Sequence, residues 1–324
     1  MLENALTVQA PSRLHFGLLS FNNPQSKQFG GVGIMISRPG ITLNVRPSTS
    51  FRCCGVHANR VAAFAEVWQR YHHLDSLPHC EIEVETAPPQ HVGLGLGTQL
   101  ALSTASALNQ YAQGKVANAV ELAKSVGRGR RSAIGTHGFE QGGFLFELGK
   151  SDADEVSVLE RRIAMPASWR VLLIRPELPE GLSGNVEQAA FAELPPVPLA
   201  VTETLTSEII TNMIPALESS DLDRFAQSVA CYGETAGRCF QACQGGPYAS
   251  PQVHEVVDRL RRIDIPVSQS SWGPTLFAFA ESQAAAESLV TRVQQNDIAV
   301  QIEISEPNNH GATISVADGP HAAS

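Results

Sequence analysis

Residues 91–99 read HVGLGLGTQ, and the segments on either side of this stretch decide the fold. Residues 80–84 (CEIEV) alternate in polarity, which predicts a half-exposed strand. Residues 98–112 have helical composition, and this helix is expected to stop at Gly114. Glycines let the backbone turn tightly and approach a ligand, and the N-terminus of a helix attracts anions. The stretch predicts a phosphate-binding loop rather than an ordinary connection. Its expected phosphate-binding residues are Gly93, Gly95, Gly97, Thr98 and Gln99.

Two familiar classes of phosphate loop do not fit these residues. No Gly-Lys-Ser/Thr triplet follows the glycines, so the loop is not a Walker A motif. The glycines recur at every second position, whereas a dinucleotide fingerprint spaces them as G-x-G-x-x-G.

Outward from the loop, the first half of the chain is strand-rich and the second half is rich in helices. The expected strands are 7–8, 14–19, 41–45, 80–84, 144–148, 170–174, 276–280 and 298–304, the last of which closes the chain. The expected helices are 61–71, 98–112, 116–126, 198–218, 221–243, 250–264 and 283–296. This order predicts two α+β domains, a phosphate-binding domain over residues 1–160 and a second domain over residues 161–324.

Composition and charge narrow the class of protein. The chain has 324 residues, of which 43% are hydrophobic and 17% charged, so it has ample material for a buried core. Its net charge of −9 disfavours nucleic acid and anionic membranes as partners, and any anionic substrate needs a local basic patch. Neither a signal peptide nor a transmembrane run is evident, and the six cysteines form no CxxC pair. We therefore expect a cytoplasmic protein with free thiols.

A local basic patch is present in residues 127–140, which read GRGRRSAIGTHGFE. Three arginines fall within four residues, and a guanidinium offers a planar fork of donors that suits phosphate and carboxylate. A solvated surface loop is the alternative. The flanking glycines favour a specified backbone and hence a binding role. The binding residues expected here are Arg128, Arg130, Arg131, Ser132, Gly135 and His137.

Two further elements stand near the ends of the chain. Arg13 and His15 are two residues apart in a strand-like segment, so their side chains share a face, although a lone histidine there is also compatible with a core position. Trp272 and Gly273 lie in the run QSSWGPT before an apolar strand. Trp272 is either a core residue or a platform for an aromatic ligand. No metal site is evident, and Glu140 and Glu147 are only candidates for one.

The order of these elements resembles the GHMP kinase superfamily of small-molecule kinases. The segment APSRLHFGL takes the place of the first motif, HVGLGLGTQLA resembles the phosphate loop PxxxGLGSSxA, and SWGPTLFAF resembles the C-terminal glycine motif. Two departures argue against kinase activity. Thr98 and Gln99 replace the paired serines, and no aspartate occurs between Tyr111 and Ser151, where many of these kinases carry a catalytic one.

A more specific resemblance accommodates these departures. The segments SRLHFGLL, FGGVGIMI, HVGLGLGTQLAL, GRGRRSAIGTHGFEQGG and QSSWGPTLFAF are similar to the β-ribofuranosylaminobenzene 5′-phosphate synthase family. The resemblance implies a ribosomal-S5-like first domain, a ferredoxin-like second domain, Mg²⁺ as cofactor and a homodimer. It also implies phosphoribosyl pyrophosphate and 4-aminobenzoate as substrates, which condense with loss of CO₂ and pyrophosphate in methanopterin biosynthesis.

On this interpretation Arg13, His15 and Arg131 are the expected catalytic residues, and the other residues of the four elements bind phosphate and substrate. An ATP-dependent kinase or diphosphate decarboxylase of the same superfamily is the alternative. A third hypothesis is that the protein is a non-enzymatic ligand-binding module.

Overall fold

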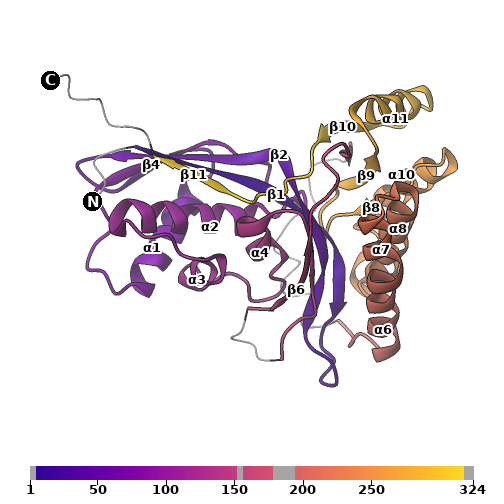
Figure 1. Ribbon diagram of the computed structural model, residues 1–324, viewed down its shortest axis with the longest axis horizontal. Helices are drawn as coiled ribbons and strands as arrows, with labels where there is room; N and C mark the ends of the chain where they lie inside the picture. Colours follow the sequence, from indigo (N-terminus) through magenta and orange to yellow (C-terminus); the bar gives the residue numbers. More distant parts are fainter. Residues whose placement is uncertain (1–4, 152–155, 178–193, 317–324) are drawn as a thin grey trace.

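Two β-sheets, each covered by helices, are joined through the long first strands of the chain (Figure 1). The computed structural model describes residues 5–151, 156–177 and 194–316. The first sheet contains β1 (Leu6–Ser20), β2 (Phe29–Pro47), β3 (Arg52–Gly55), β4 (Cys80–Thr86), β5 (Phe144–Glu147), β6 (Leu159–Ile163) and β11 (Thr313–Val316). Its order is β11-β1-β2-β4-β3, with β5 paired to β2 and β6 to β5.

The strand β1 is longer than the sequence indicates. The expected segments 7–8 and 14–19 belong to one strand of 15 residues that continues through Pro11. The pairing of β1 with β2 shifts register between Ala10 and Ser12. Because a bulge leaves one residue unpaired, Pro11 can lie in the strand although it has no N–H to donate. The single long strand carries Arg13 and His15 toward the second sheet.

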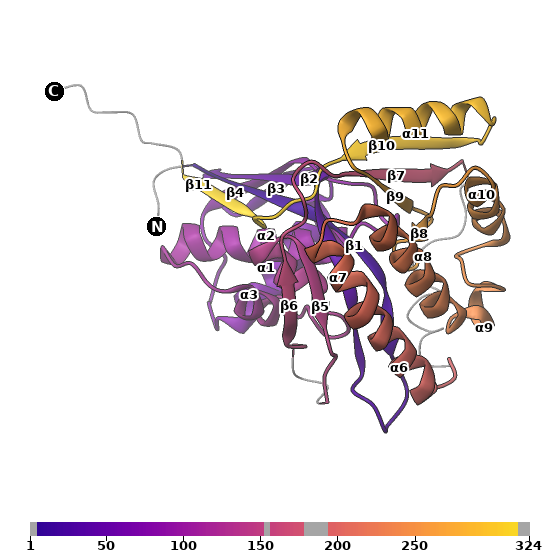
Figure 2. The ribbon, with the colours of Figure 1, turned by 45° about the vertical axis from the view of Figure 1, so that its right-hand side comes forward.

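Helices cover one face of the first sheet, as both ribbon views show (Figure 2). They are α1 (Ala58–Tyr71), α2 (Leu96–Leu108), the π-helical turn η1 (Asn109–Gln113), α3 (Ala119–Ser125) and α4 (Ile134–Gln141). Helix α1 buries Val61, Ala65 and Trp68 because these residues recur at one face of a helix. Helix α2 is buried along nearly its whole length, so the loop at its start is held on a rigid element. Helix α4 lies in the glycine-rich segment, where no helix is expected from the sequence.

The second sheet is antiparallel and has the order β10-β7-β9-β8. Its strands are β7 (Arg170–Pro176), β8 (Ser268–Gln269), β9 (Leu276–Ala280) and β10 (Val300–Ser305). The helices of this half are α6 (Leu199–Glu208), π-helical η2 (Ile209–Met213), α7 (Ile214–Glu218), α8 (Leu222–Arg238), α9 (Gln241–Gln244), α10 (Pro251–Arg262) and α11 (Gln283–Gln295). In chain order the strands lie 4-1-3-2, the ferredoxin-like arrangement. The expected two-domain α+β fold is confirmed.

The boundary between the halves differs from a simple cut at residue 160. Strand β6 spans that position and pairs with β5 of the first sheet. Strand β11 returns from the end of the second half to pair with β1, so the expected close of the chain at residue 304 is wrong. A short strand near a chain end carries little hydrophobic signal of its own, because its neighbours in the sheet supply the pairing.

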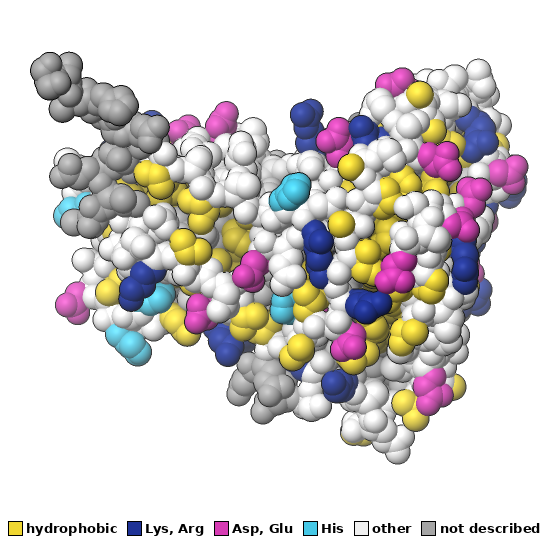
Figure 3. All heavy atoms as spheres, in the orientation of Figure 1, with side chains coloured by type: hydrophobic (Ala, Val, Ile, Leu, Met, Phe, Trp, Pro, Cys, Tyr) yellow, Lys and Arg dark blue, Asp and Glu magenta, His cyan; other side chains and the backbone are white. Residues whose placement is uncertain are grey.

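One hydrophobic cluster extends across both halves. The ring of Phe16 on β1 stacks on that of Phe277 on β9, with ring centroids 5.1 Å apart. The Tyr232 hydroxyl on α8 donates a hydrogen bond of 3.0 Å to the carbonyl of Gly17. Figure 3 shows acidic and basic side chains interspersed on one face of the molecule. Within the described ranges, no helix is both long and apolar enough to cross a membrane.

Candidate functional site

The glycine loop ends at the N-terminus of α2, and arginines from three segments surround it. Gly95 precedes the helix with a φ of 72°, a left-handed conformation that favours glycine, and no side chain caps the helix end. A Cβ added at Gly95 would lie 3.0 Å from Nε of Arg13. A Cβ added at Gly97 would lie 2.9 Å from Nη2 of Arg60 and 3.1 Å from Nη2 of Arg128. We call Arg13, Arg60 and Arg128 the arginine cradle.

The arginine cradle concentrates positive charge in a partly buried place. Arg128 donates a hydrogen bond of 3.1 Å to Oγ1 of Thr98. Burial lowers the pKa of Arg128, and the like charges of Arg60 and Arg131 lower it further. Of the carboxylates in the described ranges, none lies within ion-pair distance of Arg60 or Arg128. A cluster of like charges at a helix N-terminus can bind an anion such as a phosphate or diphosphate.

Gly135 and Gln99 complete this side of the site. A Cβ added at Gly135 would lie 3.4 Å from the Thr98 methyl group and 3.6 Å from Cδ of Arg13. The Gln99 amide is buried and donates a hydrogen bond of 2.7 Å to the carbonyl of Gly135. The amide that replaces the second serine of the resembled motif therefore ties α2 to α4. The structure brings together three of the four segments that the sequence singled out.

The fourth segment closes the site from the second half of the chain. Ser270 accepts a hydrogen bond of 3.1 Å from the backbone N–H of His15 and donates one of 2.6 Å to the carbonyl of Gly93. The N–H of Ser271 donates 2.9 Å to the carbonyl of His15. A Cβ on Gly93 would run into the backbone of Ser270, and one on Gly273 into that of Gly93. Close backbone packing thus explains why Gly93 and Gly273 are glycines.

His15 and Ser132 meet behind this contact. Nε2 of His15 lies 3.0 Å from Oγ of Ser132. The Ser132 hydroxyl in turn lies 2.6 Å from Oε1 of Glu147, a carboxylate with no exposed surface. Burial lowers the pKa of His15, and the positive charge of Arg13 lowers it further. His15 is therefore neutral at pH 7 and sits in a polar network rather than in an apolar core.

Several expected site residues have other surroundings. Arg130 is exposed, whereas Arg128 and Arg131 are half-buried. Nε2 of His137 lies 2.7 Å from the carbonyl of Ser157, and this buried ring holds two segments together. The roles proposed for these residues from the sequence remain predictions.

Trp272 and Glu140 also have structural contacts. The Trp272 ring packs edge-on against Phe240 with centroids 5.0 Å apart, in a cluster of apolar side chains, which favours the core alternative. Oε2 of the exposed Glu140 accepts a hydrogen bond of 3.2 Å from the N–H of Ala119, the first residue of α3. The described part of the chain contains no group of three or more His, Cys, Asp or Glu side chains that could hold a metal ion.

Sequence reasoning missed two residues of the site. Arg60 lies on α1, far from any motif, and reaches Gly97 only because α1 packs beside α2. No local signal distinguishes it from a surface arginine. Ser270 belongs to the quoted run before β9, but its hydroxyl bridges His15 and Gly93 only in the folded chain.

Comparisons with known proteins agree with this architecture. The family model for the N-terminal domain of GHMP kinases matches residues 59–146, and the model for the C-terminal part of GHMP kinases matches residues 213–299. The chain is similar to the homoserine kinase of Cytophaga hutchinsonii, with a TM-score of 0.68, 17% identity and coverage of 97% of this chain and 98% of the kinase. It is also similar to the mevalonate diphosphate decarboxylase of Staphylococcus aureus, with a TM-score of 0.62, 12% identity and coverage of 96% and 98%.

Two curated relatives share one name, beta-ribofuranosylphenol 5′-phosphate synthase. The protein of Methanothermobacter thermautotrophicus is 29% identical over 299 residues, which cover 86% of this chain and 89% of the relative. The protein of Archaeoglobus fulgidus is 28% identical over 330 residues, which cover 96% and 100%.

Proposed function

The chain belongs to the GHMP kinase superfamily, and from this premise we propose that it is a phosphoribosyltransferase rather than a kinase. We propose that it condenses phosphoribosyl pyrophosphate with a para-substituted benzoate, releasing CO₂ and pyrophosphate, in methanopterin biosynthesis. The observation that carries the proposal is the arginine cradle at the N-terminus of α2, which suits a departing diphosphate. The segment in which many of these kinases place a catalytic aspartate contains none in this chain.

The proposed reaction needs little acid–base chemistry from the protein. An electron-donating group para to the carboxylate makes the carboxyl-bearing ring carbon nucleophilic. That carbon bonds to C1 of the ribose while the bond from C1 to the diphosphate oxygen breaks, and pyrophosphate leaves with the electron pair. The bond to the carboxyl carbon then breaks, CO₂ leaves and aromaticity returns. No proton is removed, so the protein must position two anions and stabilise negative charge on pyrophosphate.

The roles of the residues follow from their places. We propose that Arg60, Arg128, Gly97 and Thr98 hold the diphosphate, with Arg13 and Arg131 at its edge toward His15. Half-buried guanidinium groups stabilise an anion more strongly than fully solvated ones, because less water competes for the charge. The glycines allow close approach of the diphosphate to the backbone of α2.

The acceptor is a benzoate with an amino or a hydroxyl group at the para position. The resemblance in the sequence implies 4-aminobenzoate, whereas the name of the curated relatives specifies a phenol product and hence a hydroxyl group. Both groups donate electrons to the same ring carbon, so one mechanism serves both. Both acceptors therefore belong in the test.

Mg²⁺ is the implied cofactor, and the residues present fit it only as an ion carried by the diphosphate. Oε2 of Glu140 is held by Ala119, and both oxygens of Glu147 accept hydrogen bonds within the protein. The described ranges contain no cluster of ligating side chains. Mg²⁺ is commonly bound through substrate phosphates and waters, and it would neutralise diphosphate charge there.

The decisive experiment uses purified protein, phosphoribosyl pyrophosphate, Mg²⁺ and each acceptor labelled at the carboxyl carbon. The proposal predicts labelled CO₂ and pyrophosphate in equal amounts, with a large loss of both in Arg128→Ala and little loss in Arg130→Ala. Formation of ADP from ATP with a small alcohol or a diphosphate acid, and no labelled CO₂, would instead support a kinase or a diphosphate decarboxylase. Tight binding of phosphoribosyl pyrophosphate without turnover would support a binding module. A homodimer, also proposed from the resemblance, is tested by light scattering of the same sample.

A further inference from the structure

A carboxylate with no exposed surface, Glu147, lies at the end of β5 in an otherwise apolar strand. The N–H of Ala133 lies 3.0 Å from each of its two oxygens, and the Ser132 hydroxyl lies 2.6 Å from Oε1. Burial raises the pKa of Glu147, while these hydrogen bonds oppose that rise. A distance of 2.6 Å is typical of a hydroxyl that donates to an ionised carboxylate. The carboxylate also lies at the N-terminus of α4, which favours negative charge.

The hydroxyl of Ser132 has one proton and two lone pairs, and each is assigned by its neighbours. The backbone N–H of Ile134 can only donate, and it does so to Oγ of Ser132 over 3.2 Å. The Ser132 hydroxyl donates to Oε1 of Glu147, so its one proton lies toward the carboxylate. The remaining lone pair faces Nε2 of His15 at 3.0 Å. Nε2 must therefore carry a proton.

The same reasoning determines whether the other imidazole nitrogen, Nδ1, carries a proton. Because His15 is neutral and Nε2 is protonated, Nδ1 carries a lone pair. Among the described residues Nδ1 has no hydrogen-bond partner. The backbone N–H of His15 donates a hydrogen bond to Ser270, and its carbonyl accepts one from Ser271, so the ring cannot shift along the strand. Arg13 lies two residues earlier on the same face of β1, with no register shift between the two.

We propose that Glu147 and Ser132 are positioning residues that hold His15 in the Nε2-protonated form, so that Nδ1 accepts a hydrogen bond from substrate bound beside Arg13. The donor on the substrate is a hydroxyl or amino group. Given the proposed function, it belongs either to the ribose of phosphoribosyl pyrophosphate or to the para position of the acceptor. The tautomer itself does not depend on the proposed function. If Ser132 had only a structural role, it would hold the His15 ring in place without determining which ring nitrogen carries the proton.

Nitrogen NMR of protein labelled with ¹⁵N-histidine tests the tautomer directly. The His15 signals are assigned from their loss in His15→Gln. We expect a neutral ring at pH 7 with the proton on Nε2. Ser132→Ala removes the acceptor and should give a mixture of tautomers or the Nδ1-protonated form. Ser125→Ala is the matched control, because this buried serine bonds only to the carbonyl of Leu122 over 2.7 Å and should leave the His15 signals unchanged.

The outcomes that overturn the proposal are equally specific. An Nδ1-protonated ring in the wild-type protein would mean that Glu147 is protonated and donates to Ser132. An unchanged tautomer in Ser132→Ala would show that Ser132 does not select it. If Ser132→Ala does not fold, Glu147→Gln serves as the second variant and should alter the tautomer population as well.

Titration with each substrate identifies the donor. A shift of the Nδ1 signal with phosphoribosyl pyrophosphate alone assigns the donor to the ribose, and a shift only when the acceptor is added assigns it to the para group. No shift with either substrate, when calorimetry shows that both bind, would overturn the substrate contact. If neither substrate binds, the proposed function fails. The tautomer in the free protein would still be decided.

Discussion

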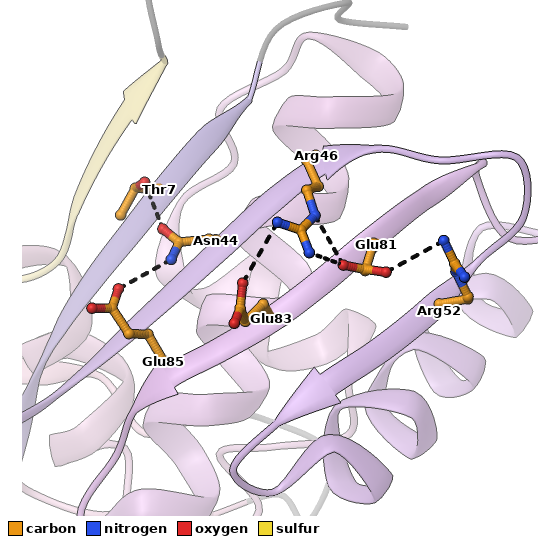
Figure 4. Close-up of polar contacts among 7 residues, drawn as sticks. All are labelled: Thr7, Asn44, Arg46, Arg52, Glu81, Glu83 and Glu85. Atoms are coloured by element: carbon orange, nitrogen blue, oxygen red, sulfur yellow. Dashed lines mark hydrogen bonds and ion pairs between the residues drawn. The ribbon is translucent and has the colours of Figure 1, made fainter.

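Two groups of arginines in the first half of the chain show how a structural arginine differs from one in a binding site. On the open face of the first sheet, Arg46 on β2 and Arg52 on β3 flank Glu81 on β4 (Figure 4). Nε of Arg46 lies 2.9 Å from Oε1 of Glu81, and Nη2 of Arg52 lies 3.4 Å from Oε2. The hydrogen bond with Glu81 raises the pKa of Arg46. These charges satisfy one another on an exposed surface.

Arg60 and Arg128 of the arginine cradle have the opposite arrangement, because no carboxylate of the described ranges lies within ion-pair distance of either. Arg128 is half-buried, its neighbours Arg60 and Arg131 are also positive, and its pKa is lowered. Such an arrangement costs stability in the empty protein, and an anion would relieve it. The difference lies in what the guanidinium groups face: Arg46 and Arg52 face a carboxylate, whereas Arg128 faces two like charges.

Removal of one cradle arginine should have the largest effect. Arg128→Ala should lower kcat/KM for phosphoribosyl pyrophosphate about 10- to 100-fold, because a charge-assisted hydrogen bond contributes about 1.5–3 kcal/mol. Steady-state kinetics over a range of phosphoribosyl pyrophosphate concentrations measure this. Arg46→Ala is the matched control and should keep wild-type kinetics. Equal kinetics for both variants and the wild type would remove the distinction between the two groups.

The glycines sharpen the comparison, because two of them should respond in opposite ways. Gly97 lies inside α2 without a left-handed φ, so Gly97→Ala should raise stability slightly. The new methyl group would displace the guanidinium groups of Arg60 and Arg128 and weaken diphosphate binding about tenfold, or about 1.4 kcal/mol. Gly93→Ala should instead destabilise the fold by about 1–3 kcal/mol, since its φ is 87° and the added Cβ meets backbone. Thermal melts and pyrophosphate titrations distinguish the two. Equal losses of stability in both variants would indicate that the whole loop is only a tight turn.

The neutral histidine beside the cradle predicts a dependence of stability on pH. The pKa of His15 is lowered in the folded state from an ordinary value of 6.5, so below that pH the unfolded chain binds a proton that the folded chain does not. As the pH is lowered, the free energy of unfolding should fall more steeply in the wild type than in His15→Gln, by up to about 1.4 kcal/mol per pH unit. The raised pKa of Glu147 acts in the opposite direction but is shared by both proteins. Urea denaturation at about pH 7.5 and about pH 5.5 measures the difference. Parallel curves would show that the fold does not lower the pKa of His15.

The smallest effect is expected on the open sheet face. Glu81→Gln removes the carboxylate between Arg46 and Arg52, which are exposed and screened by solvent, so stability should change little. Melting temperatures at low and high salt measure this. A marked loss of stability that disappears at high salt would show that the exposed network matters more than its exposure suggests.

Much of this architecture could be predicted from the sequence because its signals are local. The glycine loop, the arginine run and the apolar strand of residues 276–280 each carry their own pattern. The parts that could not be predicted depend on long-range contacts. Arg60 joins the cradle through the packing of α1 on α2, and β11 is a strand because β1 offers it an edge.

Glu147 lies between these two cases. From the sequence, Glu147 in the run FLFEL is only a candidate metal ligand. Its actual partners, Ser132 and Ala133, are set by how α4 begins, and that helix is hidden in a glycine-rich segment with weak helical propensity. The sequence therefore predicts neither its partners nor its position beside His15.

The central claim is that the cradle arginines bind the diphosphate, and calorimetric titration with phosphoribosyl pyrophosphate tests it most directly. The wild type, Arg60→Ala, Arg128→Ala and Arg46→Ala are titrated side by side at one salt concentration. The account predicts that the Arg60 and Arg128 variants each bind about tenfold or more weakly, while Arg46→Ala binds as the wild type does. Equal affinities in all four proteins would contradict it.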